Sequence, residues 1–173
     1  MNYVFIGRFT PFHKGHYNAI LSSISNREVD IVHLLLGSCN HSLSMRHFFT
    51  MEQRIDIINT ALRDMPFMYR IIPIPDYDTD SEWTTHLNLI IKQCGIDSPT
   101  FITGSYADSV VTRGANYVHT EYNRFDKGEK ISATEIRDCL FRCRELPDYF
   151  VNKEHKKLVQ EYFTANFNKF KTM

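Results

Sequence analysis

Two histidines near the N-terminus have a spacing that suits phosphate chemistry. His13 and His16 lie three residues apart, which places both imidazoles on one side of a helix. The same stretch carries hydrogen-bond donors on Arg8, Thr10 and Lys14. A short apolar run, Tyr3–Ile6, ends at Gly7, and a helix is predicted from Lys14. Because backbone N–H groups at a helix N-terminus bind anions, this stretch is a candidate phosphate-binding loop.

Two other interpretations of the histidine pair carry less weight. A zinc site would need further ligands, and no cysteine or acidic residue stands nearby to complete one. Two unrelated surface histidines are common for a bare H-x-x-H, but the preceding Gly-Arg-Phe-Thr-Pro-Phe context argues against chance. We therefore expect no metal ion to be held by protein side chains alone.

A second stretch, Ile131–Arg137, has the features of an anion-binding helix start. Ser132 and Glu135 fit a capping box, which predicts that Ser132 stands at a helix N-terminus. Arg137 follows about one turn into that helix. A capping box is common and usually only structural. This stretch therefore indicates phosphate binding only because the chain also contains the first stretch.

Both stretches carry a family resemblance. Gly7–His16 resembles the first signature of the nucleotidyltransferases with a (T/H)-x-G-H motif. More narrowly, it resembles the G-R-F-x-P-F-H-x-G-H form found in nicotinamide mononucleotide (NMN) adenylyltransferases of the archaeal, NadM, type. Ile131–Arg137 is similar to the second signature of the same superfamily, I-S-x-T-x-x-R. The two occur in the expected order, and the resemblance covers most of the chain.

The resemblance implies both a fold and a reaction. The fold would be α/β, a Rossmann-like doubly wound parallel sheet of about five strands. The reaction would be ATP plus NMN giving NAD and pyrophosphate, with the NMN phosphate attacking the α-phosphorus of ATP in line. Since that phosphate is already an anion, no protein nucleophile is needed, and catalysis would rest on positioning and charge neutralisation. Mg²⁺ would be bound mainly through the ATP phosphates.

The resemblance also implies roles for individual residues. His13 and His16 would contact the α- and β-phosphates, with His16 stabilising the transition state, and Arg137 would complete the catalytic set. Arg8, Thr10, Lys14 and Arg137 would hold the phosphates that leave as pyrophosphate. The full set expected to bind ATP is Gly7, Arg8, Phe9, Thr10, Lys14, Gly104, Asp108, Ile131, Ser132 and Thr134.

An acidic turn followed by a tryptophan resembles the family segment that builds the nicotinamide pocket. Trp83 could stack on the cationic pyridinium ring, and the Asp76 carboxylate would suit the ring's charge or its carboxamide. Core packing is the alternative role for Trp83. The residues expected to bind NMN are Asp76, Trp83, Gly37, Ser38 and Arg46. Asp78 and Asp80 could hold magnesium, but a solvated acidic turn is the simpler interpretation.

Arg54 is expected to order the active-site loop rather than stand as an exposed helix charge. It follows Phe49-Thr50-Met51-Glu52-Gln53, where family members often show F-T-x-x-E-R. Thr50 and Gln53 fit a capping box for the helix that Arg54 belongs to. Gln53 stands where glutamate is usual, so the cap is kept and a charge is lost.

The remaining elements must position these residues. Branched apolar runs predict strands at 29–36, 69–74, 100–103 and 117–122, and helices begin near Lys14, Thr50, Trp83 and Ser132. A strand, helix, strand order implies parallel pairing. A last helix is predicted over about 147–163, with a frayed tail at 166–173, all within a single domain, 1–173.

Composition excludes several classes of function. The 173 residues include 20 basic and 20 acidic side chains, so a general nucleic-acid or membrane surface is not expected. Four cysteines without a C-x-x-C pair suggest free thiols in a reducing compartment. No signal peptide or membrane-spanning run is present, which makes the cytoplasm the expected location. A homo-oligomer is expected because relatives assemble.

Two alternative functions stay open at this point. One is a related nucleotidyltransferase with another acceptor, such as nicotinate mononucleotide, pantetheine phosphate or a cytidylyl acceptor. The segment containing Asp76 and Trp83 argues against the last two of these. The other is a nucleotide sensor without catalysis, against which the complete set of His13, His16 and Arg137 argues. The sequence does not rank NMN against its acid form.

Overall fold

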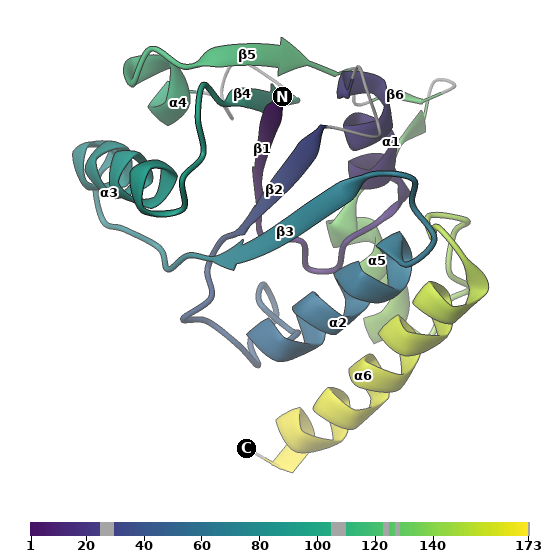
Figure 1. Cartoon of the computed structure of the whole chain (residues 1–173). Coiled ribbons are helices and arrows are strands. Elements are labelled where there is room, and N and C mark those ends of the chain that lie inside the picture. Colours follow the sequence, from purple (N-terminus) through teal and green to yellow (C-terminus); the bar gives the residue numbers. More distant parts are fainter. Residues whose placement is uncertain (25–29, 105–109, 123–124, 127–128, 173) are drawn as a thin grey trace.

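Five parallel strands form the central sheet of the computed structural model, which describes all residues except 25–29, 105–109, 123–124, 127–128 and 173 (Figure 1). The strands are β1 (Asn2–Gly7), β2 (Ile31–Leu36), β3 (Met68–Pro73), β4 (Thr100–Thr103) and β5 (Val118–Glu121). Their order across the sheet is β3-β2-β1-β4-β5, and every pairing is parallel. The expected doubly wound α/β fold with five parallel strands is confirmed.

Helices cover both faces of the sheet (Figure 1). One face packs against α1 (Lys14–Ser23), α2 (Met51–Leu62), α5 (Ala133–Phe141) and α6 (Lys153–Thr172). The other packs against α3 (Asp80–Gln93) and α4 (Val110–Gly114). Alternate residues of one strand serve the two cores, since Tyr3 and Phe5 lie in the first and Val4 in the second. Because both faces of the sheet are buried, the strands consist of nearly continuous runs of apolar residues.

The order of the strands creates a crevice beside β1. The chain builds outward from β1 through β2 to β3, then crosses to β4 on the other side of β1. In such sheets ligands bind outside the carboxyl ends of the strands where the winding reverses. Gly7 ends β1 and Gly104 follows β4 at this point. A short antiparallel pair, β6 (Phe125–Asp126) and β7 (Glu129–Lys130), comes between β5 and α5.

The last helix differs from its predicted bounds. It begins at Lys153 rather than near 147, because the Asn152 side chain accepts a hydrogen bond from the backbone N–H of His155 at 2.8 Å and caps the helix there. It continues to Thr172, so the predicted frayed tail is wrong for residues 166–172. Packing explains the extension, since Phe163 and Asn166 are buried.

Helix α3 also starts earlier than expected. It begins at Asp80, three residues before Trp83, and Thr79 and Glu82 form its capping box. Among the described residues, no helix combines the length and apolar character that crossing a bilayer requires.

Candidate active site

His13 and His16 cap the first helix reciprocally. His13 is the N-cap residue of α1, and its Nδ1 accepts a hydrogen bond from the Gly15 N–H at 3.1 Å. The Nδ1 of His16 accepts one from the backbone N–H of His13 at 3.2 Å. The two rings stack with centroids 3.7 Å apart. Because Nδ1 of His16 is an acceptor, the neutral ring carries its proton on Nε2, which makes Nε2 a hydrogen-bond donor.

A third histidine, which sequence reasoning did not single out, supports this pair. His155 of α6 is fully buried, and its Nε2 donates to the carbonyl oxygen of Phe12 at 3.0 Å. Burial lowers the pKa of His155 to about 4. Burial, together with the nearby His155, lowers the pKa of His13 to about 3. Both rings are therefore neutral near pH 7.

Two glycines of the first signature leave room for these rings. A Cβ on Gly15 would stand 3.0 Å from the His13 ring and 3.2 Å from the Cβ of Ile131. A Cβ on Gly7 would stand 2.7 Å from the ring of Phe9. The Phe9 ring in turn contacts His16 edge to face, with centroids 4.9 Å apart. Ile131 therefore lies beside the first signature, and Phe9 supports His16.

Three arginines surround a cavity of about 490 Å³, here called the arginine cavity. Its lining is Arg8, Phe9, Thr10, His16, Arg46, Ala133, Thr134 and Arg137. Arg137 Nη1 donates to the carbonyl and hydroxyl oxygens of Thr10 at 2.6 and 3.0 Å, and Nη2 donates to Thr134 at 3.3 Å. Burial and then the positive charges of Arg46 and Arg8 lower the pKa of Arg137. Concentrated positive charge of this kind favours a polyanion such as a triphosphate.

Two residues expected to bind ATP, Ser132 and Lys14, do not line the arginine cavity. Ser132 is the N-cap of α5, but its side chain makes no capping hydrogen bond, so the predicted capping box is wrong. The Glu135 carboxylate, which would complete the box by accepting the Ser132 N–H, instead accepts a hydrogen bond from the Tyr149 hydroxyl at 3.0 Å. Lys14 pairs with Asp148 at 3.4 Å and lines neither of the two cavities described here.

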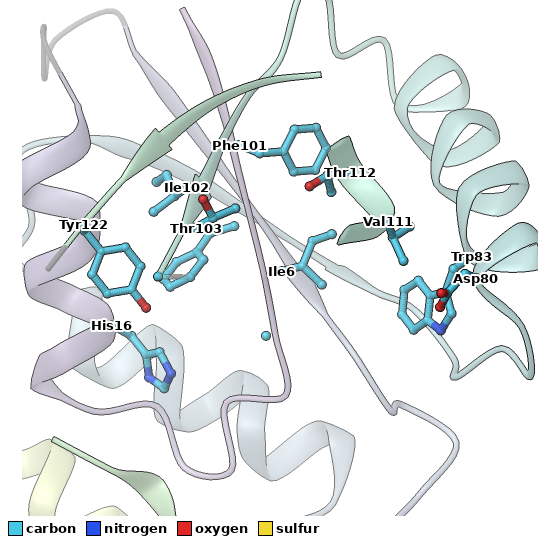
Figure 2. Close-up of a pocket in the computed structure, with 13 residues that line it drawn as sticks. Ile6, His16, Asp80, Trp83, Phe101, Ile102, Thr103, Val111, Thr112 and Tyr122 are labelled. Atoms are coloured by element: carbon cyan, nitrogen blue, oxygen red, sulfur yellow. The ribbon is translucent and has the colours of Figure 1, made fainter. Parts of the chain in front are cut away.

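A second cavity, of about 400 Å³, lies at the crevice between β1 and β4 and is here called the central cavity (Figure 2). Its lining is Phe5, Ile6, Gly7, His16, Asp80, Trp83, Phe101, Ile102, Thr103, Gly104, Val111, Thr112 and Tyr122. Trp83 and Asp80 lie at one end, and His16 and Tyr122 at the other (Figure 2). Largely apolar walls with a few polar groups suit a nucleoside.

Some of this lining was expected and some was not. Gly104 and Trp83 were expected here, and Asp108 lies outside the described residues. Tyr122 and Thr103 were missed. The buried hydroxyl of Thr103 has no hydrogen-bond partner among the described residues, so it is available to a ligand. The only sequence signal for either was position at the carboxyl end of a predicted strand.

His16 lines both cavities. A nucleotide with its nucleoside in the central cavity and its phosphates in the arginine cavity would therefore lie against the His16 ring. The arrangement places an N–H donor at the junction of an apolar site and a cationic site.

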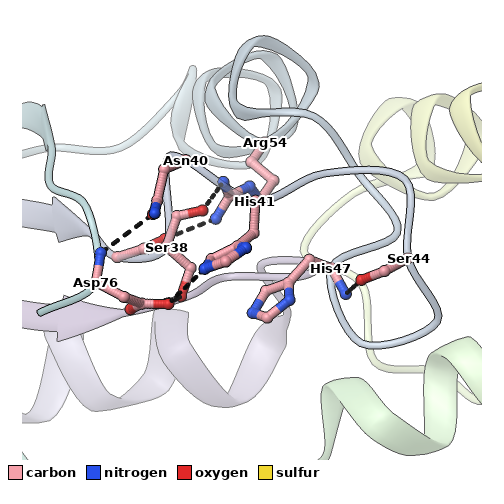
Figure 3. Close-up of polar contacts among 8 residues, drawn as sticks. Ser38, Asn40, His41, Ser44, His47, Arg54 and Asp76 are labelled. Carbon is pink, nitrogen blue, oxygen red and sulfur yellow. Dashed lines mark hydrogen bonds and ion pairs between the residues drawn. The ribbon is translucent and has the colours of Figure 1, made fainter. Parts of the chain in front are cut away.

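Asp76 does not share the central cavity with Trp83. Its carboxylate oxygens accept hydrogen bonds from the Ser38 hydroxyl at 2.9 and 2.8 Å, and His41 Nε2 lies 3.4 Å away (Figure 3). Its backbone N–H donates to Asn40 at 3.1 Å. The five residues expected to bind NMN are thus divided. Trp83 lines the central cavity and Arg46 the arginine cavity, whereas Gly37 and Ser38 of the loop after β2 lie with Asp76 of the loop after β3.

Arg54 connects the loops that follow β1 and β2. Its side chain is fully buried. Nη1 donates to the carbonyl oxygens of Arg8 at 3.0 Å and Gly37 at 2.8 Å. Nη2 donates to the carbonyl oxygen of Ser38 at 3.0 Å (Figure 3). Gly37 in turn donates its N–H to the carbonyl of Gly7 at 2.9 Å. Because one guanidinium group bonds both loops, it fixes their separation.

The acidic and histidine side chains of the described residues are the candidate metal ligands. Within the part of the chain that the structure describes, no group of three or more His, Cys, Asp or Glu side chains could hold an ion. The side chains around the arginine cavity are mostly hydrogen-bond donors.

Sequence comparison identifies related proteins. The profile of a family described as cytidylyltransferase-like matches residues 4–139. The nicotinamide-nucleotide adenylyltransferase of Methanococcus vannielii is 33% identical over 159 residues, covering 90% of this chain and 86% of the relative. That of Pyrococcus horikoshii is 29% identical over 136 residues, covering 78% and 69%.

Solved structures show the same fold. A bifunctional NMN adenylyltransferase/ADP ribose pyrophosphatase from Francisella tularensis, complexed with AMP and a manganese ion, aligns with a TM-score of 0.73 at 22% identity. The alignment covers 97% of this chain and 53% of that chain, so this chain spans about half the length of the bifunctional protein.

Proposed function

Because the chain belongs to the cytidylyltransferase-like family, we propose that it transfers the adenylyl group of ATP to NMN, giving NAD and pyrophosphate. The names of its curated relatives support this reaction, including one that is 33% identical along 90% of the chain. The single observation that carries the proposal is the position of His16, which lines both the central cavity and the arginine cavity.

The two cavities divide the substrates between them. The β- and γ-phosphates of ATP bind in the arginine cavity, against Arg8, Arg46 and Arg137. The nicotinamide ring stacks on Trp83 at one end of the central cavity, and the adenosine lies against Gly104. The α-phosphate then lies at His16, between the two cavities.

The chemistry is an in-line displacement at the α-phosphorus. An oxygen of the NMN phosphate forms the new bond, and the bond from the α-phosphorus to the bridging oxygen of the β-phosphate breaks. Negative charge then grows on the departing pyrophosphate, where the arginines neutralise it. His16 Nε2–H donates to the reacting phosphate, and His13 holds the His16 ring through their stacking.

Mg²⁺ fits this site as a companion of ATP. The residues of the arginine cavity donate hydrogen bonds and offer no carboxylate, so oxygen ligands must come from the nucleotide phosphates and water. When bound there, the ion would neutralise phosphate charge.

The reaction is tested by supplying ATP, Mg²⁺ and NMN and measuring both products. NAD is quantified with a coupled dehydrogenase and pyrophosphate with a coupled pyrophosphatase. We expect equal amounts of each. Pantetheine phosphate serves as a competing acceptor, and a preference for it would overturn the proposal. ATP binding without pyrophosphate release would instead favour a nucleotide sensor.

Trp83→Ala tests the placement of NMN. Loss of stacking should raise the KM for NMN roughly tenfold while leaving the KM for ATP nearly unchanged. If neither KM moved, Trp83 would belong to the core alone.

A further inference from the structure

Four acidic residues precede or open α3, and their side chains have different surroundings. They are Asp76, Asp78, Asp80 and Glu82. The Asp76 carboxylate is occupied by Ser38 and approached by His41 (Figure 3). The Glu82 carboxylate accepts the backbone N–H groups of Asp78 and Thr79, both at 3.1 Å, and caps the helix. Only Asp80 of the four lines the central cavity.

Asp80 and Trp83 form one end of that cavity. Asp80 is the first residue of α3 and Trp83 is three residues later, so both project from one side of the helix (Figure 2). The Asp80 carboxylate makes no hydrogen bond or ion pair within the described part of the chain. Among the described residues that line the cavity, it is the only acidic side chain, and no lysine or arginine stands with it. Its charge is therefore not neutralised by the cavity wall.

We propose that Asp80 makes the acceptor site select NMN over nicotinate mononucleotide, an inference that rests on the proposed function. Both acceptors carry a pyridinium ring that can stack on Trp83, so stacking does not separate them. They differ only in the ring substituent. The carboxamide of NMN offers two N–H donors to a carboxylate. The acid form brings a second carboxylate, which Asp80 repels.

Trp83 supplies a direct measurement of ring binding, because it is the only tryptophan in the chain. Titration of the wild-type protein with NMN should quench its fluorescence, and nicotinate mononucleotide should need roughly tenfold higher concentration for the same effect. Asp80→Asn should reduce that difference to roughly twofold, mainly by tightening the binding of the acid form, since removal of the charge removes the repulsion.

Asp78→Asn is the matched control. It removes the same charge two residues away, from a side chain that is exposed, as Asp80 is, but does not line the central cavity. The preference for NMN should stay within about twofold of wild type, because the Asp78 carboxylate lies outside the cavity and solvent screens its charge from the bound ring. If both variants changed the preference equally, the general field of the acidic turn would be responsible and the role of Asp80 would be overturned. An unchanged preference in Asp80→Asn would overturn it as well.

Product formation separates this inference from the reaction on which it rests. The ratio of kcat/KM for the two acceptors should fall roughly fivefold in Asp80→Asn and not in Asp78→Asn. If the wild-type protein formed dinucleotide equally well from both acceptors, the proposed adenylyl transfer would stand but the proposed selectivity of Asp80 would be rejected. If no dinucleotide formed, the fluorescence titration would still decide whether Asp80 discriminates the two rings, and absence of quenching by either would reject the site.

Discussion

The Nδ1 atom of His16 lies 3.2 Å from the backbone nitrogen of His13, so the side chain that lines both cavities is also part of the cap of α1. A capping box normally uses a serine or threonine with a glutamate or glutamine. Here two histidines fill both places, and their rings stack. Helix capping thus orients the N–H donor of His16, and replacement of this residue should have two separable effects.

His16→Ala should lower kcat by about 100-fold or more, because it removes a donor to the reacting phosphate. It should also lower the free energy of unfolding by about 1 kcal/mol through loss of the cap. His16→Gln keeps an oxygen that can accept the His13 N–H, as glutamine does in ordinary capping boxes. We therefore expect near wild-type stability in that variant but strongly reduced turnover.

Steady-state kinetics and urea unfolding of the two variants provide the measurements. ATP binding should persist in both, since the three arginines remain. Turnover within tenfold of wild type in His16→Ala would remove the assigned role of His16.

Arg54→Met should destabilise the protein by about 3 kcal/mol or more, because the buried carbonyl oxygens of Arg8, Gly37 and Ser38 lose their donors. Arg54→Lys should recover little of this, since an ammonium group lacks the planar fork that reaches both loops. Denaturant unfolding measures the change.

Arg63→Met is the control for Arg54. Arg63 is more than half exposed and its nearest carboxylate, on Asp64, is 3.7 Å away. Its replacement should change the free energy of unfolding by no more than about 0.5 kcal/mol. Equal effects at the two positions would mean that the bonds of Arg54 to the loops contribute little.

Gln53→Glu should destabilise the protein by about 1–2 kcal/mol near pH 7. The amides of Gln53 and Asn166 pair reciprocally: Gln53 Nε2 donates to Asn166 Oδ1 at 2.9 Å, and Asn166 Nδ2 donates to Gln53 Oε1 at 2.6 Å. A glutamate would keep the cap on Thr50 but place a carboxylate oxygen against Asn166 Oδ1. Gln160→Glu, at an exposed position of α6, should be nearly neutral in the same unfolding measurement.

Local patterns predicted what depends on neighbours in sequence. The five strands follow from short buried apolar runs, and the Thr50–Gln53 capping box was confirmed because all its partners lie within four residues. The pairing of Gln53 with Asn166 joins residues 113 apart. No local pattern indicates such a contact, and the predicted frayed tail failed for the same reason.

The sequence did not predict that Asp80, rather than Asp76, lies beside Trp83, for a related reason. Both belong to one acidic stretch, and either carboxylate could have met a pyridinium ring. Backbone geometry decides between them, because the loop after β3 turns Asp76 toward Ser38 and α3 begins early enough to place Asp80 beside Trp83. His155 is a comparable case, since a single histidine in a polar helix gives no sign that it will bond Phe12.

The buried histidines should make stability depend on pH in a defined direction. The pKa of His13 is lowered to about 3 and that of His155 to about 4, against an ordinary value of 6.5, mainly because burial disfavours the charged rings. Above pH 6.5 both rings are neutral in the folded and the unfolded chain. Below it the unfolded chain binds protons that the folded chain does not, so stability falls as the pH decreases from 6.5 toward 4.

Comparison with His155→Gln isolates one of these rings from the carboxylates that titrate in the same range. Each such histidine contributes about 1.4 kcal/mol per pH unit within this window. The stability difference between wild type and the variant should therefore shrink by about that amount per unit from pH 6 to pH 4, as measured by urea unfolding. A difference that stayed constant over this range would show that His155 takes up a proton as readily in the folded chain as in the unfolded one.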